Sequence, residues 1–284
     1  MFFLDVAVYL CVMKKIFISL VVVASLSGAA HAQKFNLGKA ASAASKGVSA
    51  MTFTNEDAVK LAKDAVDWMD ANNEVAGPDN PYTERLERLF GKHQTQDGLA
   101  LNYKVYLVRD INAFACADGS VRVFSSLMDI MTDDELLSII GHEIGHVKNE
   151  DTKDAMKNAY LTAAAMDAAS ASSNKVEALS ESQLGEMANA MLGASHSRKQ
   201  ESQADEYAYN FMKQHNYDVV AAYRAFRKLS LLSSGASKVS GFEKMLSSHP
   251  DSDKRAEAVK AKAEAEGLWQ DPGTVELPTE PITQ

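Results

Sequence analysis

The chain is poor in cysteine, which excludes a fold held together by disulfides. Its 284 residues contain two cysteines, and the first, Cys11, lies in an N-terminal segment that we expect to be removed. The remaining thiol, Cys116, has no partner for an internal disulfide. No histidine lies near Cys116 in the sequence. We therefore interpret Cys116 as a small buried apolar side chain and not as a nucleophile.

Long apolar runs are absent after residue 30, so a protein with several membrane-spanning helices is excluded. Before that point two lysines precede the run IFISLVVVASLSGAA, and the small residues Ala30 and Ala32 lie at its end. A basic start, an apolar centre and small residues at the end are typical of a signal peptide. We predict a signal peptide over residues 1–32, cleaved before Gln33, with Met13 as an alternative start. The other interpretation is an uncleaved anchor, for which the run is short.

Basic residues are also scarce. Without residues 1–32 the chain carries 27 Lys and Arg against 37 Asp and Glu, a net charge of −10. Such a charge argues against nucleic acid and anionic lipid surfaces as partners. No cysteine follows the apolar run, so we expect no lipid anchor. These features predict an exported, periplasmic protein, either free or peripheral to a membrane.

Apolar periodicity and turn residues predict the organisation of the rest. We expect a flexible leader over 33–54, a folded domain over 55–267 and a disordered, proline-rich tail over 268–284. Within the domain, residues 102–108 alternate as in a strand, and the ADGS turn at 117–120 indicates a hairpin. The alanine-rich stretch 159–195 fits either helices of low specificity or a regulatory lid.

The most informative segment is HEIGH, residues 142–146, on a helix that the capping pair Thr132 and Glu135 begins. Residues four apart lie on one face of a helix, so His142 and His146 can bind one zinc ion. Glu143 lies beside such an ion and is placed to act as the base that activates water. An accidental match on a well-capped helix is the alternative.

A hydrolytic zinc site needs a third protein ligand. The chain offers His93, His196, His215, His249 and many carboxylates. We favour Glu201, because it lies on a second well-marked helix from about residue 197 to 214. Asp205 shares its face and can accept a hydrogen bond from a ligand histidine. Taken alone, the segment ESQAD would be a solvated helix face.

His249 precedes a proline, which holds it in an extended turn. It is either a surface-loop histidine or a functional one. A functional His249 would donate to the oxyanion that forms at the carbonyl, or occupy the open position of zinc in a resting state. The residues alone leave these alternatives open.

Taken together, HEIGH, SRKQESQAD and SSHP resemble the CAAX prenyl protease and HtpX-like family of zinc metallopeptidases, over about residues 55–255. The resemblance implies an α+β, mainly helical gluzincin-type domain with a small antiparallel sheet beside the zinc helix. It implies one zinc ion per chain on His142, His146 and Glu201, with Glu143 as base. It also implies that an edge strand pairs with the substrate backbone; its residues are Asn112, Ala113, Phe114 and Ala115.

Two departures qualify the resemblance. The anchoring cysteine of lipoprotein relatives is missing. A histidine that follows the motif helix in a relative is Asp151 here, to which we give no zinc role.

We therefore expect a zinc metalloendopeptidase of the bacterial envelope that cuts unfolded or misassembled envelope proteins and has possible envelope protein partners. The alternatives are a catalytically silent chaperone or binding module, and a zinc hydrolase of another amide such as cell-wall peptide. An intact set of His142, Glu143, His146 and Glu201 argues against the silent module, which needs no base.

Overall fold

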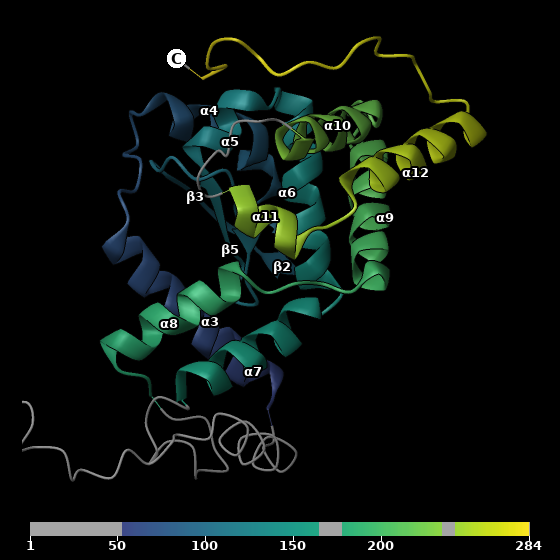
Figure 1. The fold of residues 1–284 in the computed structure, drawn as a ribbon. Helices are drawn as coiled ribbons and strands as arrows, with labels where there is room; N and C mark the ends of the chain where they lie inside the picture. The colour runs from purple at the N-terminus through teal and green to yellow at the C-terminus, as the bar shows by residue number, and fades with distance from the viewer. Residues whose placement is uncertain (1–52, 165–177, 235–241, 284) are drawn as a thin grey trace, which may run out of the picture. The chain divides into compact units, whose positions relative to one another are not determined.

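A computed structural model describes residues 53–164, 178–234 and 242–283 and shows helices arranged around a small sheet (Figure 1). The helices are α3 (Asn55–Asn72), α4 (Pro81–Phe90), the short η1 (Gly91–His93), α5 (Ser125–Ile130), α6 (Asp133–Lys148), α7 (Asp151–Ala164), α8 (Glu181–Leu192), α9 (Arg198–Gln214), α10 (Val220–Ser234), α11 (Phe242–Ser248) and α12 (Ser252–Ala265). The strands are β1 (Thr95–Gln96), β2 (Leu99–Ala100), β3 (Asn102–Tyr106), β4 (Ala113–Ala115) and β5 (Ser120–Phe124). The mainly helical α+β class is confirmed.

The larger sheet has the order β3-β5-β4 and differs in one respect from the expected antiparallel one. Strands β4 and β5 form the predicted antiparallel hairpin, whereas β3 runs parallel to β5. The cause is the connection at residues 107–112, which carries the chain past β5, so that β4 pairs with its other side. This order leaves β4 at an edge of the sheet.

The central strand β5 separates two apolar cores. Val121 and Val123 belong to the core built around α6. Phe124, on the other face of β5, belongs to a second core with α3, α7 and α8. Arg122 also points to that face, because successive side chains of a strand alternate. The edge strand β4 also contacts α6, the helix with the HEIGH motif. The sheet therefore holds β4 next to that helix.

An ion-pair network around the buried Arg122 ties α3 to the sheet. Both oxygens of the Asp70 carboxylate accept hydrogen bonds from Arg122, at 2.8 and 2.9 Å. Lys104 and the Tyr106 hydroxyl donate to the same carboxylate, each at 2.7 Å. Burial alone would raise the pKa of Asp70, but these hydrogen bonds outweigh it and lower the pKa to about 2. Asp70 therefore stays ionised at neutral pH.

The C-terminal tail was expected to be disordered, and the structure contradicts this at its end. The Ile282 main-chain N–H donates to the Asp129 carbonyl. Thr283 is buried, and its hydroxyl accepts a hydrogen bond from Arg85 at 2.6 Å. Arg85 also donates to the Met128 carbonyl. An arginine has five N–H donors, and Thr283 of the tail accepts from one donor of the buried Arg85. The proline-rich composition of the tail gives no sign of this contact.

Several expectations fall outside the described residues, namely the signal peptide 1–32 and most of the leader 33–54. The described part of the stretch 159–195 contains the end of α7 and the whole of α8, and residues 165–177 lie outside the described ranges. No helix in the described ranges has both the length and the apolar character needed to cross a membrane.

Candidate metal centre

The HEIGH helix, α6, begins with the predicted capping box. The Thr132 main-chain N–H donates to the Glu135 carboxylate at 2.8 Å. The same carboxylate pairs with Lys228 of α10 at 2.7 Å. The helix start is therefore held by its own cap and by a neighbouring helix. Two turns later, His142 and His146 bring their Nε2 atoms to 3.0 Å from each other.

Helix α9 brings Glu201 to these histidines and runs side by side with α6 (Figure 1). It begins with a second capping box at Ser197. The close approach depends on Gly145, because a Cβ there would lie 3.1 Å from Ala204 Cα and 3.2 Å from the Ala204 carbonyl oxygen. A contact so short forces a side chain or a backbone to move. The glycine in the motif thus lets α9 bring Glu201 close to the two histidines.

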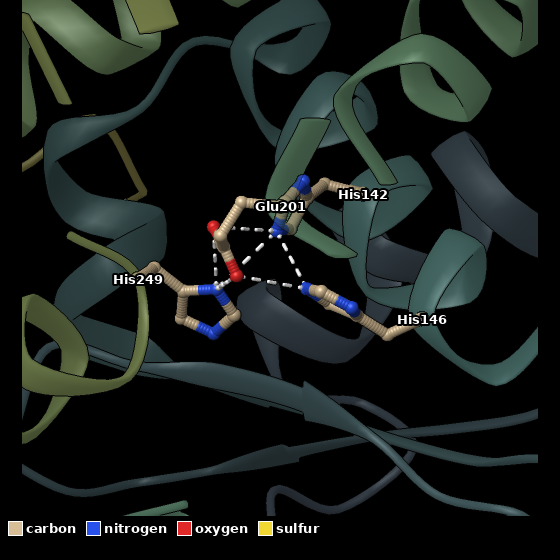
Figure 2. Close-up of side chains that lie close together, drawn as sticks. All are labelled: His142, His146, Glu201 and His249. Atoms are coloured by element: carbon tan, nitrogen blue, oxygen red, sulfur yellow. Dashed lines mark hydrogen bonds and ion pairs between the residues drawn. The ribbon is translucent and has the colours of Figure 1, made fainter. Parts of the chain in front are cut away.

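Four side chains converge on one point, as Figure 2 shows: His142, His146, Glu201 and His249. Their candidate ligand atoms all lie within 4.8 Å of one another, and all four residues are buried. His146 Nε2 lies 3.2 Å from Glu201 Oε1, and His249 Nδ1 lies 3.1 Å from the same oxygen. Ligands at 2.0–2.1 Å from a tetrahedral zinc ion are about 3.3 Å apart. The donor set of three imidazoles and one carboxylate therefore fits zinc in both chemistry and spacing.

Each motif histidine has an acidic partner on its other ring nitrogen. His142 Nδ1 lies 2.9 Å from Asp205 Oδ1, the contact predicted for Asp205. His146 Nδ1 lies 2.9 Å from Asp151 Oδ2. Such partners orient the ring so that the opposite nitrogen faces the metal. Asp151 is outside the donor group, as expected, but it positions a ligand, which sequence analysis missed.

Arg255 of α12 is a second residue that sequence analysis missed. It is buried, and its guanidinium bridges Glu201 Oε2 at 2.7 Å and Asp205 Oδ1 at 2.5 Å. The guanidinium also lies over the Phe226 ring, 4.1 Å from its centre. Arg255 therefore balances the buried carboxylate of Glu201 and the partly buried one of Asp205, which would otherwise repel each other. The signal that could have indicated it is its place six residues after His249, in SSHPDSDKR.

Glu143 is buried and lies beside His249. Its Oε1 atom is 3.6 Å from His249 Nε2. Burial raises the pKa of the Glu143 carboxyl group above its usual range, which is the direction that suits a base working near neutral pH. Burial and the charge of Arg255 lower the pKa of His142 well below its usual range, so His142 is neutral, as a metal ligand must be.

A cavity of about 60 Å³ opens beside Glu143 and His146. Its walls include all four residues of the expected substrate strand, Asn112, Ala113, Phe114 and Ala115, together with His196 and side chains of α7 and α8. The adjoining Cys116 is 2% exposed. Burial raises the pKa of its thiol, so the predicted role as a buried apolar side chain agrees with the structure.

The hydrogen-bond register shows which backbone groups of β4 are free. The Phe124 N–H donates to the Asn112 carbonyl, and the Cys116 N–H donates to the Ser120 carbonyl. Bonded pairs alternate in an antiparallel ladder, so Ala113 and Ala115 turn their backbone groups to the open edge. The Asn112 side chain accepts from the Ala113 N–H at 2.9 Å. Among the described residues, the other outward groups have no hydrogen-bond partner and are available to an added strand.

Comparison with known proteins places this site in a family. The sequence profile of peptidase family M48 matches residues 82–263. The chain is 34% identical to the metalloprotease YcaL of Escherichia coli K12 over 238 residues, 84% of this chain and 92% of the relative. It is 35% identical to the metalloprotease LoiP of the same organism over 209 residues, 73% of this chain and 81% of the relative. A shorter match, 32% over 82 residues, is to the protease HtpX of Vibrio campbellii and covers 27% of this chain and 28% of that protein.

The profile match spans most of the folded residues, and two relatives match over most of their own length. The resemblance read from the motifs is thereby confirmed, as is zinc as the cofactor. The chain belongs to peptidase family M48, and it is a zinc metalloendopeptidase that acts on protein or peptide substrates.

Proposed function

We propose that this enzyme is a quality-control endopeptidase of the bacterial cell envelope that cuts extended segments of unfolded or misassembled proteins. The observation that carries the proposal is the edge strand β4. It lies beside Glu143 and the donor group, with the outward backbone groups of Ala113 and Ala115 directed to the cleft. An extended peptide can add to such an edge, and a folded segment cannot.

The residues divide the reaction between them. His142, His146 and Glu201 would hold zinc, which supplies a Lewis acid that polarises a carbonyl and makes water more acidic. Glu143 takes a proton from the attacking water while the oxygen of that water bonds to the scissile carbonyl carbon. Glu143 then gives that proton to the nitrogen as the carbon–nitrogen bond breaks. One water is consumed, and a carboxyl and an amino terminus are formed.

His249 fits the resting-state role better than the oxyanion role. Its Nδ1 atom lies 3.3 Å from His142 Nε2 and within the donor group, in the place of a fourth ligand. A hydrolytic zinc site leaves that place open to water and substrate. We propose that His249 closes the centre until a substrate displaces it.

The location in the envelope rests on the signal peptide predicted for residues 1–32, followed by no anchoring cysteine. We propose an exported, periplasmic enzyme, at most peripheral to a membrane. Cell fractionation of the full chain tests this, because recovery in the cytoplasmic fraction with residues 1–32 attached would contradict it.

The first experiment measures zinc content and cleavage of unfolded casein by the purified chain. We expect about one zinc ion per wild-type chain, loss of zinc in Glu201→Ala, and retained zinc without cleavage in Glu143→Gln. Cleavage by a folded, zinc-loaded Glu143→Gln variant would show that Glu143 is not the catalytic base. Cleavage of cell-wall peptide but not casein would favour the other amide hydrolase, and zinc without any cleavage would favour the chaperone.

A further inference from the structure

His196 lies beside the metal centre, in the connection between α8 and α9, and the mechanism above does not use it. Its ring stacks on that of His146, with centroids 3.8 Å apart and planes 16° apart. Its centroid is 5.6 Å from that of His249. His196 also lines the cavity that Glu143 and β4 share. An imidazole thus faces the substrate cleft next to a ligand histidine.

The position of His196 is held from both sides. The stack on His146 fixes one face of the ring, and the main-chain N–H of His196 donates to the Ser248 carbonyl at 3.3 Å. Ser197, the next residue, is the cap of α9. The side chain is half-buried. A donor that is fixed before the substrate arrives costs no reorganisation during the reaction.

The hydrogen-bonding capacity of this ring is unused. Within the described part of the chain, the ring nitrogens of His196 have no hydrogen-bond partner. By contrast, His142 is paired with Asp205, His146 with Asp151, and His249 with Glu201. A neutral imidazole always carries one N–H. His196 can therefore donate to a group that enters the cleft, which the other three rings cannot do without losing a partner.

Hydrolysis creates the need for such a donor. As water attacks, negative charge grows on the scissile carbonyl oxygen, and a fixed donor aimed at that oxygen accelerates the reaction. An oxyanion donor was one of the roles expected for His249, but its Nδ1 lies in the donor group and its Nε2 faces Glu143. We propose that His196 is a further catalytic residue, whose ring N–H donates to the scissile carbonyl oxygen as its charge develops. This inference rests on the proposed endopeptidase function.

The competing explanation is that His196 only packs against His146 and keeps it in place. Three substitutions separate the two roles. His196→Phe keeps an aromatic ring for the stack and removes the N–H. His196→Gln keeps an N–H donor and removes the aromatic ring. His196→Ala removes both. His215→Ala is the matched control, since His215 is a half-buried histidine at the far end of α9, packed on Phe211.

The assay is cleavage of a fluorogenic casein peptide by zinc-loaded enzyme, with zinc content measured for every variant. We expect kcat to fall about 10²–10³-fold in both His196→Ala and His196→Phe. KM and zinc content should stay near the wild-type values, and His196→Gln should recover part of kcat. A phosphonamidate peptide, which imitates the charged oxygen, should lose affinity in parallel with kcat/KM. His215→Ala should match the wild type.

Full activity in His196→Phe would assign the ring to stacking and overturn the proposal. Full activity in His196→Ala, or loss of zinc as the cause of the defect in His196→Phe, would overturn it as well. A wild-type enzyme that cuts no peptide would instead refute the endopeptidase proposal itself. Cleavage by the wild-type enzyme therefore distinguishes failure of the His196 proposal from failure of the endopeptidase proposal.

Discussion

Removing the guanidinium of Arg255 tests how the buried charges of the centre are balanced. Arg255 is 7% exposed and makes contacts of 2.5–2.9 Å to two carboxylates, those of Glu201 and Asp205. Arg255→Met keeps most of the side-chain length and leaves both acids without their cation. Removing one partner of a buried ion pair destabilises a protein by about 3–5 kcal/mol. We expect a loss of this size in the free energy of unfolding of the zinc-free enzyme.

The loss should be smaller with zinc bound, because the metal ion supplies positive charge to Glu201, while Asp205 keeps only its contact with the His142 ring. Urea unfolding of chelator-treated and zinc-loaded protein measures both values. Arg255→Lys should be intermediate, since a lysine cannot bridge two acids as a planar fork does, and it keeps the test valid if Arg255→Met does not fold. The control is Arg198→Met, an exposed arginine 3.5 Å from Asp251, for which we expect at most about 0.5 kcal/mol. A loss below about 1 kcal/mol in zinc-free Arg255→Met would refute the reasoning.

Three further predictions concern acid stability, the resting state and helix packing. The folded pKa of Asp70 is about 2 instead of 3.8, so its pairing contributes about 2 kcal/mol above pH 4 that is lost as pH falls toward 2. Over this pH range the urea unfolding midpoint should fall more in the wild type than in Asp70→Asn. An equal fall in both proteins would contradict the stabilising role of the Asp70 ion pairs. His249→Ala should raise cleavage of short peptides at unchanged zinc content; lower activity would instead support a catalytic role. Gly145→Val should cost about 1–3 kcal/mol by overpacking against Ala204, seen as a lower melting temperature, and an unchanged one would show that α9 moves freely.

The features that were predictable from the sequence are local ones. The start of α6 follows from Thr132 and Glu135, which are three residues apart and satisfy each other's backbone groups. The start of α9 follows in the same way from Ser197 and Gln200. Once both helices are placed, the residue types and the four-residue spacings indicate the metal ligands.

The features that were missed depend on tertiary contacts. The parallel pairing of β3 with β5 depends on how residues 107–112 cross the sheet, and a strand of five residues carries no mark of its partner's direction. Asp151 reaches His146 because the backbone turns at Glu150, where φ is 60°. Arg255 reaches Glu201 only after α12 packs beside α9. None of these contacts leaves a periodic pattern in the chain.

The four converging residues come from three distant places in the chain, and this has a consequence for the lifetime of the enzyme in the cell. There are 55 positions from His146 to Glu201 and 48 from Glu201 to His249, so one bound ion closes two long loops and restricts the unfolded chain. Zinc bound to the folded form alone adds stability that grows with free zinc concentration. The zinc-free enzyme unfolds more often and is exposed to other proteases. Scarcity of zinc would then lower the amount of this protein as well as its activity.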